Sequence, residues 1–199
     1  MHRKLGVFCI MAGICCLISS VGFVLYNSVE EKKAKAASEL MIESIYQQIN
    51  ETAEEIVSDY IVEEVSREMP TTEVDGYECI GILSIPVLEV ELPVLTDWSY
   101  AKLKIAPCHY YGTYYEPNFV LAAHNYQSHF GRLSELKQKD VITFTDVSGK
   151  IYYYEVVLIE TLRSNATLEM ITSGFDLSLY TCTPGGGSRV TVRCNQIEK

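Results

Sequence analysis

Basic side chains are scarce in this sequence, and the body of the chain has no run of them that could bind nucleic acid. Lysine and arginine together number 16 against 26 aspartates and glutamates, so the formal net charge is −10. Because phosphate recognition needs concentrated positive charge, we exclude nucleic acid as a partner. The acidity is uneven, since residues 30–73 hold 12 acidic and 4 basic side chains, which predicts a solvated stalk.

The sequence also lacks the residue spacings of a metal site. Its seven cysteines include no C-x-x-C pair and no Cys/His cluster, and its scattered acidic residues do not make a calcium ligand set. We therefore predict no metal and no cofactor. Outside a membrane a disulfide could form among Cys79, Cys108 and Cys194, and the sequence does not name the pair.

One long apolar run stands near the N-terminus. Residues 5–26 contain no charged side chain and are long enough to cross about 30 Å of hydrocarbon as a helix. A cleaved signal peptide is the alternative, although its apolar core is usually shorter, roughly 7 to 15 residues. We predict an uncleaved anchor at 5–26 after a cytoplasmic tip at 1–4. The lysines that follow the run leave the orientation open on charge alone.

The acidic segment after the anchor has a helical pattern. Apolar side chains recur three, four or seven residues apart at Ile42, Ile45, Ile49, Ile56 and Tyr60. We interpret residues 27–76 as a helical stalk and linker, with the helix ending near residue 69. A spacer that packs loosely or pairs with itself is the preferred interpretation, and a regulatory or docking element is the alternative.

Beyond residue 76 the chain changes to short β-type runs separated by glycine, proline, asparagine and aspartate. Seven such runs occupy residues 81–85, 89–95, 119–122, 141–145, 151–161, 177–182 and 189–196. Two short helices at 100–105 and 131–136 are too few for βαβ layers. We therefore predict a mainly β domain over residues 77–199, folded as a closed, mostly antiparallel β-barrel.

Cys182 has the sequence context of a nucleophile. It ends the apolar run and is followed by Thr183, Pro184 and three glycines, so the strand stops and the thiol lies beside a turn. Arg189 then starts the returning strand opposite it and brings a fixed cation near the sulfur. A cysteine becomes nucleophilic when a base or a positive charge favours its thiolate.

Histidine is the natural proton-transfer partner, because it can take and give a proton near neutral pH. His124 directly follows an apolar run and emerges at a strand end, whereas His2 lies in the N-terminal tip and His109 in an aromatic segment. His129 lies five residues further, in a loop. Each residue alone is a weak signal, since a single cysteine at a strand end is more often a small buried hydrophobe.

The joint pattern is more specific than its parts. Residues 178–182, Ser-Leu-Tyr-Thr-Cys, resemble the Thr-Leu-x-Thr-Cys active-site strand of sortases, the cysteine transpeptidases of Gram-positive cell surfaces. Leu-Ala-Ala-His-Asn at 121–125 and Phe-Gly-Arg-Leu at 130–133 resemble that family's histidine motif and its downstream signature. Arg189 matches the family's active-site arginine, and Arg193, on the same strand face, is the alternative.

The resemblance implies a function. A sortase cuts a Leu-Pro-x-Thr-Gly-like sorting signal near the C-terminus of a secreted protein, between Thr and Gly, and transfers the acyl group to an amine. Carried over, Cys182 forms the thioester, Arg189 stabilises the developing charge and His124 moves the proton. The acceptor amine belongs to a peptidoglycan precursor or a pilin lysine. The implied location is the cell membrane, crossed once, with the catalytic domain outside; the subclass stays open.

The connection 163–175, between two strong strands, is predicted to form a substrate wall, because binding residues favour loops held by a rigid scaffold. A short helix that covers the barrel end is the alternative. The aromatic segment 109–115 is interpreted as a cover for the barrel edge, with substrate binding as its alternative. The residues predicted to bind the sorting signal are Ala166, Leu168, Met170, Ile171 and Thr181.

Two other functions are compatible with the same residues. A surface cysteine peptidase that only hydrolyses uses the same nucleophile and base. A non-enzymatic anchored β-barrel that binds a ligand would keep Cys182 merely buried. Product analysis separates the first from a transpeptidase, and thiol reactivity separates the second.

Overall fold

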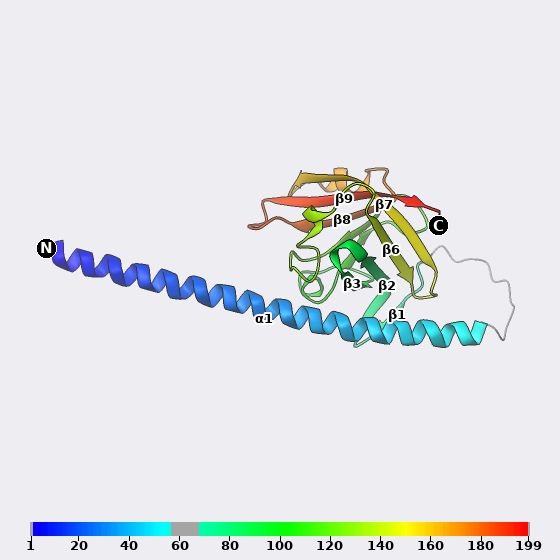
Figure 1. The fold of residues 1–199 in the computed structure, drawn as a ribbon, viewed down its shortest axis with the longest axis horizontal. Helices are drawn as coiled ribbons and strands as arrows, with labels where there is room; N and C mark the ends of the chain where they lie inside the picture. The colour runs from blue at the N-terminus through cyan, green and yellow to red at the C-terminus, as the bar shows by residue number, and fades with distance from the viewer. Residues whose placement is uncertain (1, 57–67, 199) are drawn as a thin grey trace.

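One long helix leads into a β-domain. The computed structural model describes residues 2–56 and 68–198, and helix α1 (His2–Ile56) extends far past the β-domain on its N-terminal side (Figure 1). The strands of the described chain form one sheet: β1 (Thr72–Val74), β2 (Tyr77–Ile85), β3 (Val90–Leu95), β4 (Cys108–Tyr111), β5 (Phe119–Ala122), β6 (Val141–Asp146), β7 (Ile151–Arg163), β8 (Leu177–Cys182) and β9 (Ser188–Ile197).

The sheet closes into a barrel. Strands follow the order β1-β2-β3-β4-β5-β8-β9-β7-β6. A further antiparallel pairing of β2 with β6 closes the sheet from β2 round to β6 into a barrel, and β1 lies at its edge. The pairs β3 with β4 and β5 with β8 are parallel, and the others are antiparallel. The prediction of a closed, mostly antiparallel barrel is confirmed. Among the strands of the described residues, only β1 and β4 fall outside the seven predicted runs, because strands of three and four residues are too short to show a period.

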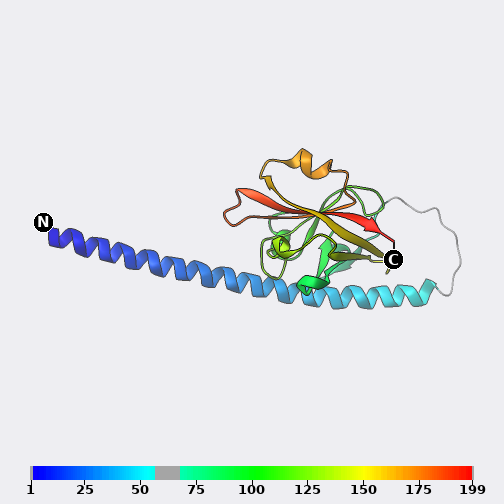
Figure 2. The ribbon, with the colours of Figure 1, turned by 45° about the horizontal axis from the view of Figure 1, so that its top comes forward.

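Helices are few and short in the β-domain. The predicted helices at 100–105 and 131–136 are single 3₁₀ turns, η2 (Lys102–Lys104) and η3 (Leu133–Glu135), and a third turn, η1 (Pro86–Leu88), joins β2 to β3. The connection after β7 contains α2 (Thr167–Ile171). Helix α2 lies on the side of the barrel opposite α1 (Figure 2).

Gly81 allows the barrel to close. Strand β2 pairs along one edge first with β1, as far as Cys79, and from Gly81 onward with β6. At Gly81 φ is +154°, and a Cβ atom there would lie 2.1 Å from the backbone oxygen of Thr145. Only glycine lets β6 approach this closely, so any larger residue would push the closing strands apart.

Aromatic rings fill part of the barrel interior. The rings of Tyr114 and Phe119 lie 5.7 Å apart, and that of Tyr114 lies 5.0 Å from Phe144 and 4.9 Å from Tyr152. The segment 109–115 is therefore more than the predicted edge cover. It begins within β4, and its Tyr114 is a core residue that is only 2 % exposed.

The predicted solvated stalk is in fact packed along the barrel. Met41 and Ile45 of α1 are 1 % and 0 % exposed, and they pack against buried residues of β2, β3 and β4 that include Cys79, Leu95 and Cys108. The spacings of three and four that predicted a helix thus describe its buried face. The structure shows this helix docked on its own barrel; its predicted course past Ile56 lies outside the described residues.

Polar contacts reinforce the docking of α1. The carboxylate of Glu31 accepts the backbone N–H of Ser128 at 3.2 Å, in the loop after β5, and the Ser38 hydroxyl donates to the Ile105 carbonyl at 3.1 Å.

Helix α1 also contains a segment, within Ile10–Glu51, that is long and apolar enough to cross a membrane by length and composition. The apolar part of α1 therefore continues directly into its docked part.

Candidate active site

Strand register brings the three predicted catalytic residues to one end of the barrel. Strands β5 and β8 run parallel with Ala122 opposite Tyr180, so His124 and Cys182 each stand two residues beyond a paired position. The parallel pairing continues one step further, because the backbone N–H of Ala123 donates to the Tyr180 carbonyl at 3.2 Å. Strand β9 runs antiparallel to β8, and Arg189 is the partner of Cys182 in that register.

A tight hairpin holds Cys182 at the strand end. The backbone N–H of Thr183 donates to the Ser188 carbonyl at 3.0 Å, and that of Gly186 to the Thr183 carbonyl at 2.8 Å. Gly185 and Gly186 adopt φ values of +83° and +74°, a conformation that glycine enters without steric strain. The turn therefore forces the chain back at once, and Cys182 stays half-buried, not sealed in the interior.

Cys182 lies between two pockets, each of about 210 Å³. The first lies toward α2 and is lined by Tyr110, Ala166, Met170 and Arg189, among others. The second lies toward the histidine loop and is lined by Asn125, Phe130, Thr181 and Val190, among others. Cys182 therefore borders an open space on each of two sides.

His124 is held by its neighbours in the loop after β5. Its Nδ1 lies 3.1 Å from the backbone nitrogen and 3.1 Å from the side-chain Oδ1 of Asn125, and its ring stacks on Tyr126 at 4.4 Å and 8°. A neutral ring can accept the backbone N–H at Nδ1, and a protonated ring can donate to Oδ1. Asn125 can thus partner both protonation states. The lining of the two pockets includes Asn125 but not His124.

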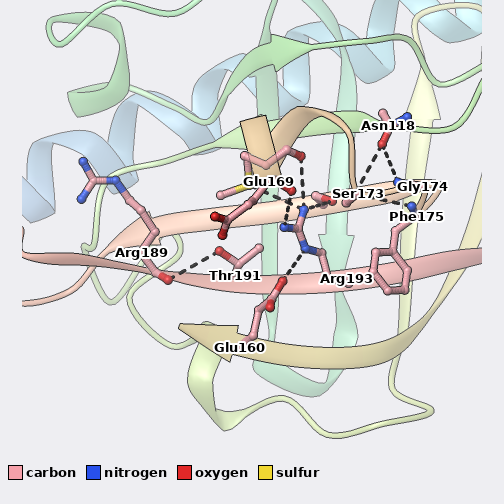
Figure 3. A network of polar contacts seen from close by, with 11 residues as sticks. Asn118, Glu160, Glu169, Ser173, Gly174, Phe175, Arg189, Thr191 and Arg193 are labelled. Atoms are coloured by element: carbon pink, nitrogen blue, oxygen red, sulfur yellow. Dashed lines mark hydrogen bonds and ion pairs between the residues drawn. The ribbon is translucent and has the colours of Figure 1, made fainter. Parts of the chain in front are cut away.

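Arg189 faces the mouth of the barrel. Its Nη1 donates to the carbonyls of Gly186 and Ser188, both at 3.0 Å, which fixes the side chain on its own hairpin. The residue lines the first pocket together with Cys182. Figure 3 shows its guanidinium directed away from that of Arg193. A permanent cation therefore lines the same pocket as the thiol.

The alternative arginine, Arg193, does not belong to the mouth. It is 1 % exposed and forms an ion pair with Glu160, Nε to Oε1, at 2.8 Å. Its other nitrogens donate to the carbonyls of Glu169 and Met170 and to the Ser178 hydroxyl (Figure 3). Strand alternation gives Arg189 and Arg193 the same face, but the guanidinium of Arg193 donates its hydrogen bonds to these interior partners.

The predicted substrate residues divide between the two pockets and the surface. Ala166 and Met170 line the first pocket, as the wall hypothesis requires. Thr181 is buried, donates its hydroxyl to the Ala123 carbonyl at 2.9 Å and lines the second pocket. Leu168 is 70 % exposed, and neither Leu168 nor Ile171 lines either pocket. The connection 163–175 contains the short helix α2, as the alternative interpretation expected, and its role as a substrate wall stays a prediction.

Aromatic side chains complete the first pocket; Tyr110 belongs to the segment 109–115, for which substrate binding was the alternative, whereas Trp98, Tyr100 and Tyr180 were not among the predicted site residues. Tyr180 precedes Cys182 by two positions and lines the pocket with Trp98, Tyr100 and Tyr110. The Tyr180 ring packs edge-on against Tyr110 at 5.4 Å, and burial raises the pKa of its hydroxyl. Alternate residues of a strand share a face, so the spacing of Tyr180 and Cys182 was a usable signal.

The remaining thiols and the second histidine have different surroundings. Cys79 and Cys108 are free, and burial raises the pKa of each to about 12. Burial also raises the pKa of the free Cys194 thiol. His129 is fully buried, and desolvation followed by the charge of His124 lowers its pKa to about 4. These groups are poorly suited to catalysis, since a thiolate or a titrating imidazole is needed.

Within the described residues, no group of three or more His, Cys, Asp or Glu could hold a metal ion. The strand register brings a thiol, an imidazole and a guanidinium to one end of the barrel. A family model described as the sortase domain matches residues 83–197. The chain belongs to the sortase family. It is a cysteine transpeptidase with the sortase barrel.

Solved sortases share the fold. The Clostridium perfringens sortase D5 transpeptidase is 19 % identical, covers 82 % of this chain and 99 % of that one, and superposes with a TM-score of 0.62. Sortase C1 from Streptococcus suis is 27 % identical over 61 % of this chain and 74 % of that one, with a TM-score of 0.54. Clostridium perfringens sortase C with the C-terminal cell wall sorting motif is 21 % identical over 79 % of this chain and 90 % of that one, with a TM-score of 0.55. No curated protein matched. Similarity to both C and D classes leaves the subclass of this sortase open.

Proposed function

We propose that this sortase cleaves a Leu-Pro-x-Thr-Gly-like sorting signal between Thr and Gly and transfers the acyl group to an amine. The single observation that carries the proposal is the strand register that brings His124, Cys182 and Arg189 to one barrel end. Residues 5–26 anchor the protein in the cell membrane, with residues 1–4 in the cytoplasm. Residues 27–76 connect this anchor to the extracellular catalytic barrel at 77–199.

Acylation uses all three side chains. The Cys182 thiolate attacks the Thr carbonyl carbon, so a C–S bond forms and charge develops on the carbonyl oxygen. Arg189, fixed beside the thiol, stabilises that charge or the substrate backbone. Protonated His124 gives its proton to the Gly nitrogen as the C–N bond breaks, and the Gly-bearing fragment leaves. The acyl half stays on Cys182 as a thioester.

Deacylation reverses the proton transfer. An incoming amine loses a proton to His124, attacks the thioester carbonyl and forms an amide, while Cys182 leaves as the thiolate. The two partners of the His124 ring at Asn125 support this cycle, because one suits the neutral and the other the protonated imidazole. The two pockets beside Cys182 offer separate approaches for the signal and the amine. The acceptor is a peptidoglycan precursor amine or a pilin lysine.

The first pocket is the proposed site for the signal's leucine and proline. Its lining is partly aromatic and apolar, with Tyr110, Tyr180, Ala166 and Met170 beside Cys182. Aromatic and aliphatic walls with a few polar groups are typical of a pocket that binds apolar side chains. Of the residues first assigned to the signal, Ala166 and Met170 stay in this proposal, and Thr181 supports the second pocket. Exposed Leu168 and half-buried Ile171 line neither pocket and are left out of this proposal.

The test is product analysis on the full chain in detergent. The complete protein is needed because Met41 and Ile45 of α1 form one buried cluster with barrel residues, among them Cys79 and Leu95. The enzyme is incubated with a Leu-Pro-x-Thr-Gly peptide, with and without a glycine-based or lysine-based amine acceptor, and the products are identified by mass spectrometry. A Cys182→Ala chain serves as the control.

We expect a product that joins the Leu-Pro-x-Thr half to the acceptor, which Cys182→Ala does not form. Only the free acid, even at high acceptor concentration, would identify a hydrolytic peptidase instead. An intact peptide together with an unreactive Cys182 would favour the non-enzymatic barrel. Variation of the peptide at its first two positions then tests the apolar pocket.

A further inference from the structure

Arg193 connects the barrel to the pocket wall. From β9 its Nε pairs with Glu160 of β7 at 2.8 Å, and its Nη1 donates to Ser178 of β8 at 2.8 Å. The same guanidinium reaches out of the barrel to α2, donating to the Met170 carbonyl at 3.2 Å and the Glu169 carbonyl at 3.0 Å. Figure 3 shows one planar group bridging strands and helix.

The partners on α2 are backbone groups that the helix itself cannot satisfy. The carbonyls of Ala166 and Leu168 accept intrahelical bonds from Met170 and Thr172, whereas those of Glu169 and Met170 lie in the last turn. A helix of five residues is too short to be stable alone. A cation at its C-terminal end satisfies these carbonyls, so Arg193 supplies what α2 lacks.

A buried guanidinium is costly unless its donors are paired, and here the pairing is extensive. Arg193 is 1 % exposed, while its partner Glu160 keeps 30 % of its side chain exposed. The loss of hydration is repaid through charge-assisted bonds to a carboxylate, a hydroxyl and two carbonyls. No lysine could form this set, since an ammonium lacks the planar fork.

The same wall carries residues of the proposed peptide pocket. Met170 is held by Arg193 through its carbonyl, its sulfur lies 3.7 Å from Nη1, and it lines the first pocket beside Cys182. Ala166 and Thr167 of the same turn also line that pocket. The position of α2 therefore sets where this side of the pocket lies relative to the thiol.

The other end of the connection has its own anchor. Asn118 Oδ1 accepts the Gly174 N–H at 2.9 Å and the Ser173 hydroxyl at 3.3 Å, and the Arg193 guanidinium lies 6.0 Å from the centre of the Phe175 ring (Figure 3). Asn118 fixes the return of the chain to β8. Arg193 instead holds α2, the helical part of the connection, which contains the pocket residue Met170.

We propose that Arg193 is a positioning residue for substrate binding, which holds α2 at the distance from Cys182 that the sorting signal requires. This inference rests on the proposed function for its substrate, and it assigns Arg193 no contact with the reacting atoms. It predicts that loss of the guanidinium weakens peptide binding while the chemistry at Cys182 is retained.

The first test compares Arg193→Lys with the native full chain. We expect KM for the peptide to rise by about tenfold or more, with kcat changed by less than about threefold, because binding geometry is lost and the nucleophile is not. Alkylation of Cys182 by iodoacetamide, a reagent too small to need the wall, should keep its rate. Arg132→Lys is the matched control, since Arg132 also pairs a carboxylate, Glu135, and a carbonyl, Leu88, away from the pocket.

Milder variants keep the test decisive if Arg193→Lys does not fold. Glu160→Gln removes one charge and leaves the shape, so a smaller rise in KM is expected. In a Met170→Ala background, Arg193→Lys should raise KM less than in the native chain, because the pocket contact through which it acts is gone. Equal losses in kcat and alkylation rate, or an unchanged KM, would overturn the assignment.

A substrate-free measurement separates this inference from the proposed function. Amide hydrogen exchange at Met170 and Thr172, whose N–H groups make the bonds of α2, should speed up in Arg193→Lys and in Glu160→Gln but not in Arg132→Lys. Unchanged exchange in both variants refutes the positioning role. Failure of the native protein to process any sorting peptide refutes the proposed function and leaves this readout standing.

Discussion

The barrel contains two sets of the same three residue types in opposite surroundings. We call one set the mouth residues and the other the interior residues: His124, Cys182 and Arg189 against His129, Cys194 and Arg193. Every mouth residue is half-buried, and every interior residue is at most 1 % exposed. The members of each pair lie only 4 to 12 positions apart along the chain.

The difference shows that environment, and not residue type, decides the chemistry. Burial raises the pKa of the Cys194 thiol and lowers that of His129 to about 4, so one stays a thiol and the other stays neutral at physiological pH. Arg193 has committed its donors to structural partners. The mouth residues are partly exposed, and the interior residues offer a matched control for each.

The largest expected effect is at the cysteine pair. Cys182→Ala should abolish transpeptidation, a loss of about 10⁴-fold or more, because the covalent step has no substitute. Cys194→Ala should retain native kinetics and instead lower stability by about 1 kcal/mol through the small cavity it leaves. Peptide turnover and thermal melting of both chains provide the measurement. Equal activity of the two variants would erase the distinction between mouth and interior.

The arginine pair should differ in the parameter that changes. We expect Arg189→Ala to lower kcat by about 10²- to 10³-fold, as loss of a charge that stabilises the transition state does. Arg189→Lys should recover part of it, since a cation remains. Steady-state kinetics over a range of peptide concentrations give kcat and KM separately, and Arg193→Lys is the contrast that is expected to act on KM. A change confined to KM in Arg189→Ala would contradict its assigned role.

The interface between α1 and the barrel allows a second comparison of a buried residue with an exposed one. Ile45 is 0 % exposed against the barrel, whereas Leu40 on the same helix is 62 % exposed. Ile45→Asp should destabilise the protein by about 3 kcal/mol or more, because it buries an unpaired charge, and Leu40→Asp should have little effect. Melting temperatures in detergent check this. If both substitutions are tolerated equally, α1 is not docked in solution.

The smallest expected effect is the pH dependence of folding stability that His129 causes. In the unfolded chain the pKa of a histidine is about 6.5, and burial lowers that of His129 to about 4 in the fold. Between these values the unfolded state binds a proton that the folded state does not, so stability falls as pH drops from 6.5 toward 4, by about 3 kcal/mol at most. The stabilising contribution is fully present above pH 6.5.

His129→Leu should flatten this slope, because the two ring nitrogens of His129 have no hydrogen-bond partner in the described structure and an apolar side chain can replace the ring. Melting temperatures at pH 7 and pH 5 are compared between the two chains. A slope that is unchanged by His129→Leu would show that other groups, such as carboxylates, cause all of the acid destabilisation.

Local sequence patterns were enough to predict most of the barrel and its mouth. Alternating apolar residues and turn signals marked seven strands, and the motif around each of His124, Cys182 and Arg189 placed it at a strand end. These features depend on neighbours within a few positions. The same reasoning explains why β1 and β4 were missed, since they are too short to show alternation.

The features that were not predicted depend on contacts between distant segments. The face of α1 that contains Ile45 has the periodicity of any amphipathic helix, and only the barrel surface beneath it decides that it docks. Arg193 is similar, because its partners Glu160, Glu169 and Ser178 come from three other elements. Strand alternation placed both arginines on one face but could not distinguish the mouth from the interior.

The most direct test of the account is to identify the residue that carries the acyl group. The full chain is mixed with a Leu-Pro-x-Thr-Gly peptide, quenched in acid and digested, and the adduct is located by mass spectrometry. We predict the mass of the Leu-Pro-x-Thr acyl group on Cys182, lost when an amine acceptor is added before the quench. An adduct on Cys194, Cys79 or Cys108, or turnover with no adduct on any thiol, would contradict the account.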